Sequence, residues 1–600
     1  MRIKLIVSVF FIIWIVLIAR IYFISIKSNT YYDELAVQNT IRTEKLTPVR
    51  GVVLDRNDKP LAVNKLGFSI RIKPRLSYKK YRHILEEEID NIVSIFPKLK
   101  RENLLKIYKK LDSPYNHKYI KIVDFISHKD MLPFYSKLNL RKNIKITPST
   151  KRYYPNRDIA SHLIGYVSKA NKNDMKNSET IRLTGIVGKS GIEKYYNSFL
   201  EGEAGHRKIK ITAFNEEIDE IEKIPPVENN NIKLTIDLRL QKYIHSLFED
   251  KSGVAIVMDA RNGEILSAGS FPEFDINSFI GGISQREWTE LITDLRHPFT
   301  NKLVNGLYPP GSVIKMGVGL SFLEHNIHES STHYCSGEFK LGGRKFRCWK
   351  TWGHGSVDLI RAIRESCDDY FYKNSLKVGI ENISTTLKQL GLGVKTGIDL
   401  PNEWIGVVPS KRWKLHKYNK PWYMGETLIS SIGQGYSLVT PMQIARHTAL
   451  IATDRLPTPH LIKIKGFEDL RFESKDVLTP FQKSKMYLLR KGMYQAANSG
   501  TGTATKYLKG LRVKVAGKTG TAQVVGIPQE ERKRMKEEDM EYYRRSHAWL
   551  SIYAPAKKPK YIVTILVEHG GHGGESNGAI VKNIVNKLVD LGYLEPSAKR

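Results

Sequence analysis

The sequence predicts an α+β multidomain protein with an N-terminal transmembrane helix (1–27), an elongated β-rich pedestal (28–230) and a larger C-terminal domain (231–600). Three observations lead to this expectation: a long uncharged stretch near the N-terminus, short β-like runs mixed with charged helical stretches, and a proline-rich break followed by new strand and helix patterns. With 600 residues, of which 41% are hydrophobic, the chain can form several buried cores.

The N-terminal stretch is long enough to cross a bilayer once. Leu5–Ala19 carries no charge, Arg20 interrupts, and Ile21–Ile26 is again uncharged. The stretch exceeds the apolar core of a cleavable signal peptide and lacks small residues at a cut site, which indicates an uncleaved anchor. Arg2 and Lys4 precede it, so the positive-inside rule predicts a cytoplasmic N-terminus and an extracytoplasmic body from about residue 28 onward.

The charge balance favours anionic partners. Lys and Arg outnumber Asp and Glu by 95 to 61, a net charge of +34, which suits acidic lipid headgroups, wall polymers or nucleic acid. An extracytoplasmic body, and a sequence without zinc-finger, RNP or helix-turn-helix patterns, argue against nucleic acid.

The pedestal is expected to mix strands with charged helices. Residues 51–57, 68–74 and 119–126 form β-like runs, and a charged helical stretch covers 81–108. Together they indicate an elongated α+β region.

A domain boundary is expected where Pro225 and Pro226 are followed by the polar segment 227–231. Beyond it, 233–249 has the pattern of a strand that leads into an amphipathic helix, and 253–270 has that of a hairpin turning at Arg261-Asn262-Gly263. The candidate catalytic residues all lie after this boundary.

The first candidate motif is Ser312 with Lys315. Two prolines and a glycine stop an extended segment, and Ser312 then opens a helix with Lys315 on the same face. A serine hydroxyl needs a neighbouring base at neutral pH, and a partly desolvated lysine can act as one. The pattern alone also fits an ordinary helix cap. Ser77 and Lys80 have the same spacing but lack the preceding turn and the apolar helix.

Two further motifs follow in the order that a serine acyltransferase requires. Ser366-Cys367-Asp368 offers a second hydroxyl that could relay protons, and Lys518-Thr519-Gly520-Thr521 offers a cation and hydroxyls beside a strand. Gly520 leaves room for a substrate backbone. Each triplet alone is more often a solvated turn. Lys395-Thr396-Gly397 repeats the last motif, but it lacks flanking β-patterns, so we set it aside.

With these motifs the chain resembles the monofunctional class B penicillin-binding proteins, and most of all the elongation type, penicillin-binding protein 2. Asp368 stands where the wider superfamily has Asn, a variation typical of the elongation type, so its hydrogen-bonding role is left open. The resemblance implies a transpeptidase domain with a central antiparallel sheet flanked by helices. Six ordered blocks carry the resemblance: 47–64, 152–167, 188–205, 270–279, 430–445 and 547–555.

The resemblance also implies a reaction, peptidoglycan D,D-transpeptidation. Ser312 would attack the penultimate D-Ala of a stem peptide with Lys315 as base, and protons would pass through Ser366 and Lys518. Backbone N–H groups of Ser312 and Thr521 would hold the oxyanion, a contribution on the order of 3 kcal/mol per donor. Thr519 and Thr521 would bind the terminal carboxylate. β-Lactams would acylate Ser312.

Cysteine and histidine residues gather between the first and second motifs. The set Cys335, Cys348, His354 and Cys367 is spaced by 13, 6 and 13 residues and matches a tetrahedral zinc site in ligand type. A disulfide plus one free thiol is the alternative. Elongation-type relatives can carry a metal here. We expect a structural Zn²⁺ that steadies the second motif and plays no part in the chemistry.

The expected partners follow from the resemblance. They are the stem peptides of a glycan derived from lipid II, β-lactams, and a membrane glycosyltransferase of the SEDS family, similar to RodA, docked on the pedestal. The resemblance also implies a bacterial cytoplasmic membrane as the site of anchoring, with the catalytic domain in the periplasm. Two alternative functions are left open. One is a β-lactam-binding sensor or inactive scaffold, and the other is the septal division transpeptidase. A sensor would need a cytoplasmic module, whereas only about four residues precede the span.

Overall fold

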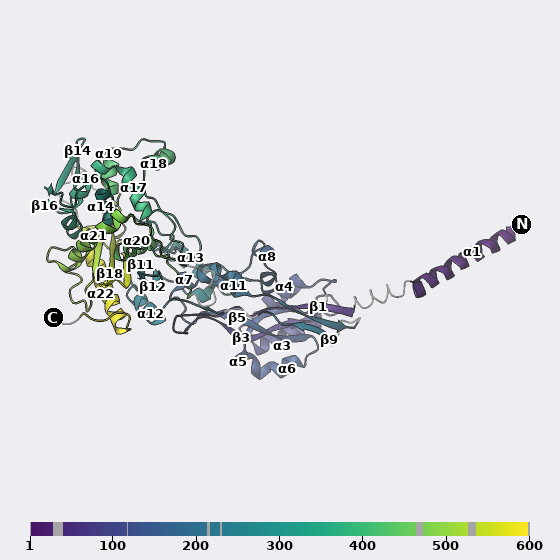
Figure 1. Cartoon of the computed structure of the whole chain (residues 1–600). Coiled ribbons are helices and arrows are strands. Elements are labelled where there is room, and N and C mark those ends of the chain that lie inside the picture. The colour runs from purple at the N-terminus through teal and green to yellow at the C-terminus, as the bar shows by residue number, and fades with distance from the viewer. Residues whose placement is uncertain are drawn as a thin grey trace.

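The computed structural model has three successive parts (Figure 1). A helix near the N-terminus is followed by an elongated, strand-rich pedestal and then by a broader domain of helices around a sheet. This confirms the predicted α+β multidomain organisation. Residues 28 and 230, the predicted ends of the pedestal, lie outside the described part of the chain. The structure describes residues 2–27, 40–116, 118–212, 217–227, 231–463, 472–525 and 536–597.

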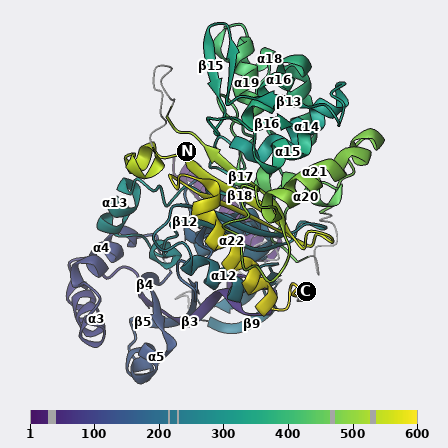
Figure 2. The same ribbon diagram turned by 90° about the vertical axis from the view of Figure 1, so that its left-hand side faces the viewer.

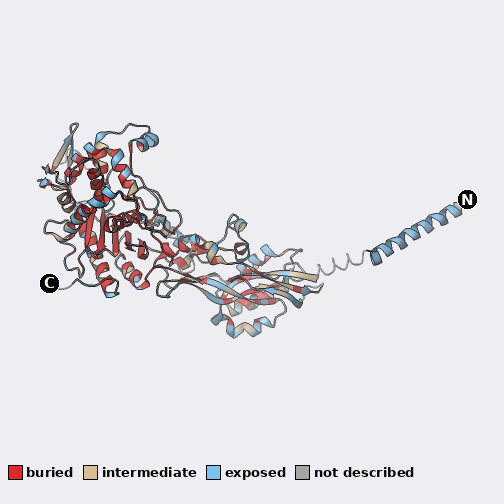
Figure 3. Cartoon of the chain, viewed as in Figure 1, coloured by how far each residue is buried: buried red, intermediate tan, exposed pale blue. Residues whose placement is uncertain are grey.

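Helix α1 (Arg2–Tyr22) continues as a π-helical stretch to Lys27. The 25 residues from Ile3 to Lys27 are apolar enough for a membrane span, and none of them is buried against the protein (Figure 3). At about 1.5 Å per residue, the helix exceeds the roughly 30 Å hydrocarbon core of a bilayer. It therefore meets the requirements of the predicted membrane anchor, and it is the one such helix among the described residues.

Two sheets form the frame of the pedestal. One has the order β1-β8-β9, and the other has the order β10-β2-β3-β4, with β5 also paired to β3. In β3 (Pro60–Ile72), the alternate residues Ile70 and Ile72 are fully buried in one core with residues of α3 (Arg82–Ile95), as the two-residue period of a strand requires. The other pedestal strands are β1 (Ile41–Leu46), β2 (Val53–Leu54), β4 (Ile120–Ser127), β5 (Ile144–Tyr153), β6 (Val167–Lys169), β7 (Ile186–Gly188), β8 (Gly205–Ile211) and β9 (Glu217–Ile224).

The helical stretch expected over 81–108 forms two helices instead of one. Helix α3 ends at Ile95 and α4 (Arg101–Leu111) follows, with Pro97 between them. Proline lacks the amide hydrogen that continues a helix, which explains the break. Among the described residues, the pedestal also contains a 3-10 helix (Leu132–Phe134) and the short helices α5 (His128–Met131), α6 (Tyr135–Asn139), α7 (Ser161–Ile164), α8 (Asp174–Asn177), α9 (Glu179–Thr184), α10 (Gly191–Tyr195) and α11 (Asn197–Glu201).

The pedestal and the C-terminal domain are joined by shared structure. Strand β10 (Ile232–Lys233) pairs in parallel with β2 of the pedestal. The Tyr196 hydroxyl of the pedestal donates to Asp399 of the C-terminal domain over 3.0 Å, and residues of both parts belong to one hydrophobic core. The pedestal therefore has a packed connection to the domain that holds the candidate site.

A five-stranded antiparallel sheet forms the centre of the C-terminal domain, as expected. Its order is β12-β11-β19-β18-β17, and the predicted hairpin over 253–270 supplies β11 and β12. Both faces are buried: Val254 and Ile256 belong to one core, whereas Ala255 and Val257 belong to another. The strands are β11 (Gly253–Asp259), β12 (Ile265–Phe271), β17 (Ala516–Ala522), β18 (His547–Ala554) and β19 (Tyr561–Val567).

Helices cover the two faces of this sheet. Helices α12 (Leu238–Ser246) and α22 (Gly573–Asp590) pack on one face (Figure 2), and α14 (Lys315–Glu324) and α20 (Pro441–Thr453) contribute to the core on the other. A lobe of helices and small strands stands beside the sheet and carries the first two motif segments, whereas the third motif lies in β17 of the sheet. The remaining elements are α13 (Gln285–Thr293), β13 (His333–Cys335), β14 (Glu338–Leu341), β15 (Arg344–Arg347), β16 (Gly355–Val357), α15 (Leu359–Arg364), α16 (Asp368–Val378), α17 (Ile380–Gln389), α18 (Lys411–Tyr418), α19 (Met424–Ser431) and α21 (Pro480–Asn498).

Candidate active site

The first motif lies on a tight turn in front of α14. Gly311–Ile314 forms a 3-10 turn and the α-helix begins at Lys315, so Ser312 lies one turn before the helix that we expected it to open. Gly311 has φ +55° and donates its N–H to the Gly433 carbonyl over 2.8 Å. Pro309 and Pro310 offer no N–H groups, which keeps the preceding segment out of the helix. Ser312 is half-buried.

Lys315 is fully buried and points to the second motif. Its Nζ lies 2.7 Å from Oδ1 of Asp368, 3.1 Å from the Ser366 carbonyl oxygen and 3.4 Å from the Ser366 hydroxyl. Burial raises the pKa of Asp368, and the nearby Lys315 ammonium opposes that shift. Asp368, whose role the sequence left open, therefore forms a buried ion pair with Lys315.

The second motif is held in an unusual backbone conformation. Ser366 has φ +55°, a region that residues other than glycine rarely adopt and that typically costs on the order of 1–3 kcal/mol. Helix α16 then begins at Asp368, whose Oδ2 accepts the N–H of Trp349 over 3.1 Å. The conformation aims the Ser366 side chain at the two motif lysines.

The third motif lies on β17, which ends the strand order of the sheet. Lys518 Nζ donates to the Ser366 hydroxyl over 2.9 Å and to the Thr519 carbonyl over 2.9 Å. Its burial, and the charge of Lys315 nearby, pull the pKa of Lys518 well below its usual value. The Ser366 oxygen thus lies within reach of both lysines, which is the arrangement that a proton relay needs.

The end of β17 lies against the turn that carries Ser312. A side chain on Gly311 would come within 2.8 Å of the Thr521 carbonyl oxygen, and one on Gly520 within 3.0 Å of Val313. The Thr519 hydroxyl donates to Thr503 over 2.9 Å. The structure therefore brings together the segments of all three motifs, whereas the Ser312 hydroxyl makes no hydrogen bond within the part of the chain that the structure describes.

The two look-alike motifs lie elsewhere. Ser77 is in the pedestal, where its hydroxyl donates to Asp112 over 2.5 Å. Thr396 lies in a loop, where its N–H donates to Glu403 over 2.6 Å. In the described part of the chain, neither segment is hydrogen-bonded to β17, whereas the fold brings together the three motifs that the sequence favoured.

Several neighbours of the site were given no role by the sequence reasoning. Gln434 donates from Nε2 to the Thr521 carbonyl over 3.1 Å, and Trp549 donates from its indole to the Pro309 carbonyl over 3.0 Å. Both lie in blocks that carried the family resemblance, at 430–445 and 547–555. Their position in these blocks is the sequence feature that could have pointed to Gln434 and Trp549 as neighbours of the site.

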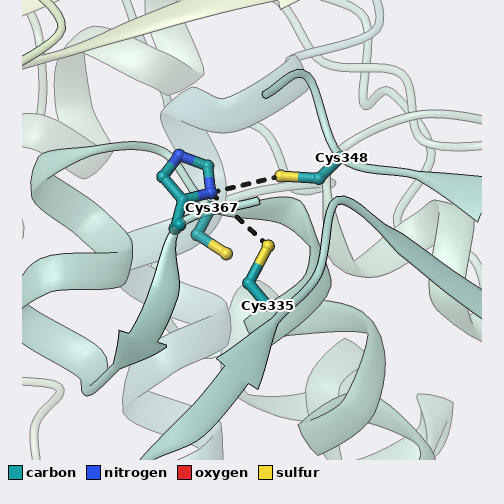
Figure 4. Close-up of side chains that lie close together, drawn as sticks. Cys335, Cys348 and Cys367 are labelled. Carbon is teal, nitrogen blue, oxygen red and sulfur yellow. Dashed lines mark hydrogen bonds between the residues drawn. The ribbon is translucent and has the colours of Figure 1, made fainter. Parts of the chain in front are cut away.

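The three cysteines and His354 converge in a buried cluster beside the second motif (Figure 4). Their candidate ligand atoms all lie within 4.8 Å of one another, and Nδ1 of His354 is 3.5 Å from the sulfurs of Cys335 and Cys348. All three cysteines are free thiols, so the disulfide alternative is not formed in this structure. Three soft sulfurs and an imidazole nitrogen at this spacing fit a tetrahedral metal ion.

Comparisons with known proteins agree with this geometry. Residues 253–589 match the family described as the penicillin binding protein transpeptidase domain, and residues 45–234 match the penicillin-binding protein dimerisation domain. The chain belongs to the penicillin-binding protein family. The predicted resemblance is thereby confirmed, and the two matches fall on the C-terminal domain and the pedestal.

Relatives within the family match nearly the whole chain. The peptidoglycan D,D-transpeptidase MrdA of Salmonella typhimurium is 31% identical and is matched over 96% of this chain and 93% of its own length. Penicillin-binding protein 2 (PBP2) of Helicobacter pylori, solved in complex with MreC, is 46% identical with a TM-score of 0.85, covering 92% of this chain and 99% of that one. A chain of a peptidoglycan synthase complex that coordinates polymerization and crosslinking is 25% identical with a TM-score of 0.71, covering 100% of both chains.

Proposed function

We propose that this protein is a peptidoglycan D,D-transpeptidase that cross-links stem peptides during cell elongation and is acylated by β-lactams. The observation that carries the proposal is the Ser366 hydroxyl, which lies 2.9 Å from Lys518 and 3.4 Å from Lys315 beside the turn that holds Ser312. The MrdA relatives support the assignment to this reaction.

In the proposed reaction, Lys315 acts in its neutral amine form and takes the hydroxyl proton of Ser312 while the Ser312 oxygen attacks the carbonyl of the penultimate D-Ala. A C–O bond forms, the peptide C–N bond breaks, and terminal D-Ala leaves with a proton delivered through Ser366 and Lys518. The N–H groups of Ser312 and Thr521 stabilise the oxyanion, and Thr519 and Thr521 bind the carboxylate. An amine of a neighbouring stem then takes the acyl group and releases Ser312.

Labelled penicillin tests the proposal directly on the full-length protein. We expect a covalent adduct at one site per chain, mapped by mass spectrometry to the peptide that contains Ser312. A pentapeptide donor and an amine acceptor should yield cross-linked product and free D-Ala. An adduct without any product would favour the scaffold or sensor reading, and the absence of an adduct would overturn the proposal.

Depletion in the host separates the elongation role from the division role. We expect round cells, because a loss of elongation leaves division intact. Filaments would assign the enzyme to the septum instead.

For the cysteine and histidine cluster we propose a structural zinc site. Cys335, Cys348, His354 and Cys367 would hold the ion, which would cross-link the segments around the second motif and take no part in the reaction. Two features support this: the buried donors are within 4.8 Å of one another, and Cys367 lies between Ser366 and Asp368.

Metal removal should therefore weaken both the fold and the reaction. Protein purified without chelator should contain one zinc per chain, and chelation should lower the free energy of unfolding by at least about 3 kcal/mol, since structural zinc contributes on the order of 10 kcal/mol in small domains. His354→Ala should have the same effect, with the exposed His416→Ala as control. Unchanged metal content, stability and acylation rate in Cys335→Ala and His354→Ala would contradict the site.

We further propose a single-pass topology with residues 1–27 as cytoplasmic stub and anchor, 28–230 as pedestal and 231–600 as periplasmic catalytic domain. Arg2 and Lys4 on the N-terminal side of α1 support this orientation. The pedestal would dock a RodA-like glycosyltransferase, which would supply the glycan derived from lipid II. The similarity to a chain of a peptidoglycan synthase complex supports that partner class.

A further inference from the structure

The segment that contains α18 is strongly basic and precedes the helix that leads to the candidate active site. We call residues 411–424 the α18 segment. It contains no acidic residue. Lys414 is buried, but four other cationic side chains are exposed and give the segment a positive surface. These are Lys411, Arg412, Lys417 and Lys420.

The same segment exposes flat aromatic rings between these charges. Tyr418 is 43% exposed and Tyr423 is 58% exposed. Lys417 Nζ lies 5.4 Å from the ring centroid of Trp413 and 5.6 Å from that of Tyr418. Exposed rings and cations that alternate on one surface of a soluble domain mark a binding site more often than a packing defect.

The surface is fixed in place rather than loosely attached. Lys414 is 2% exposed, forms an ion pair with Glu426 of α19, and lies 4.4 Å from the ring centroid of Tyr423. The ring of Trp413 packs on that of Tyr436 at 5.3 Å between centroids. The rings are therefore positioned before any ligand arrives, which reduces the entropy lost on binding.

Helix α19 connects this surface along the chain to the candidate active site. Helix α19 follows the segment and leads into the turn at Gly433 and Gln434. The Gly433 carbonyl accepts the N–H of Gly311, and Gln434 donates to the carbonyl of Thr521. One helix thus separates the basic aromatic surface from the turn that carries Ser312.

The position in the molecule argues against a lipid ligand. Figure 1 places α18 and α19 at the end of the protein remote from α1, with the pedestal between them. A ligand here has to reach the site from the wall side, given the proposed membrane orientation.

We propose that the α18 segment binds the glycan strand of uncross-linked peptidoglycan, whose stem peptides carry free carboxylates, and guides these stem peptides toward Ser312. This inference rests on the proposed function. The C–H faces of sugar rings pack on Tyr418 and Tyr423, while Lys417 and Lys420 pair with carboxylates of the stem peptides. The sugar rings belong to the polymer and are absent from a small β-lactam, which offers a carboxylate alone.

The test uses the full-length protein in detergent and co-sedimentation with purified, uncross-linked glycan strands. The variant Lys417→Gln/Tyr418→Ala/Lys420→Gln should lower the affinity for the strands at least about 10-fold, since one aromatic contact and two charges are lost. The matched control Lys557→Gln/Lys558→Gln/Tyr494→Ala alters two exposed lysines and an exposed tyrosine elsewhere on the domain and should bind as wild type.

Acylation by labelled penicillin distinguishes a failure of the glycan site from a failure of the proposed transpeptidase function. Both variants should acylate at the wild-type rate, because a β-lactam does not need the α18 segment. A wild-type protein that is not acylated refutes the proposed function. Normal acylation with unchanged strand binding in the α18 variant refutes the glycan site.

Competitors identify the ligand chemistry. A neutral oligosaccharide of N-acetylglucosamine should displace the strands in part, whereas poly-glutamate and single-stranded oligonucleotides should be weak competitors at physiological salt. Displacement by the two polyanions alone would overturn the sugar assignment, because it would leave only a general polyanion surface.

Discussion

Ser312→Ala is expected to abolish acylation of the full-length protein by labelled penicillin. The alanine variant lacks the oxygen that forms the acyl bond, so the rate should fall by at least about 10³-fold, as for other serine acyl-transfer enzymes. Because the half-buried hydroxyl makes no hydrogen bond within the described residues, the free energy of unfolding should change by no more than about 0.5 kcal/mol. Gel fluorescence and thermal unfolding measure the two quantities on one sample.

Ser77→Ala is the matched control for this variant, since Ser77 and Lys80 have the same spacing as Ser312 and Lys315. Its hydroxyl bonds to Asp112 in the pedestal, so the variant should lose a little stability and keep full acylation. Adduct formation in Ser312→Ala at a rate near wild type would place the nucleophile elsewhere and refute the proposed mechanism.

Lys315→Met is expected to lower the acylation rate roughly 10³-fold and to destabilise the protein. The methionine keeps much of the volume and removes the base, which accounts for the kinetic loss. It also leaves the Asp368 carboxylate buried without its partner, which typically costs about 3–5 kcal/mol. Stopped-flow acylation and chemical denaturation report the two losses separately.

The double variant Lys315→Met/Asp368→Asn separates the catalytic loss from the structural one. The amide removes the unpaired charge and can still accept the N–H of Trp349, so most of the lost stability should return while acylation stays slow. Recovery of the acylation rate together with stability would show that Lys315 only holds Asp368 in place. Asp368→Asn alone serves as the control for the substitution itself.

The sequence could predict the fold because its local signals agree with one another. The hairpin over 253–270, the breaking prolines and the uncharged N-terminal stretch each specify one element. The motifs could be told from their look-alikes because local context differs: Pro309, Pro310 and Gly311 precede Ser312, and β-patterns surround Lys518. The three cysteines and His354 could be predicted to form one set because thiolates and imidazole are the ligand types that zinc prefers, even though the four residues are widely spaced in the sequence.

Long-range side-chain geometry could not be predicted in this way. The ion pair of Lys315 with Asp368 joins residues 53 positions apart, and no periodic pattern encodes it. The left-handed backbone of Ser366 contradicts its residue type and exists only because the surrounding fold imposes it. The hydrogen bond from Gln434 to β17 could not be predicted either, because it depends on how α19 packs in the folded domain.

The place of β17 at the end of the sheet has a consequence for inhibitor resistance. An outer strand recognises an incoming chain through its own amide and carbonyl groups, which are the same whatever the side chains are. A compound that draws its affinity from this main-chain pattern would be hard to evade by amino-acid replacement. Compounds that depend on individual side chains around the cleft leave the bacterium far more routes of escape.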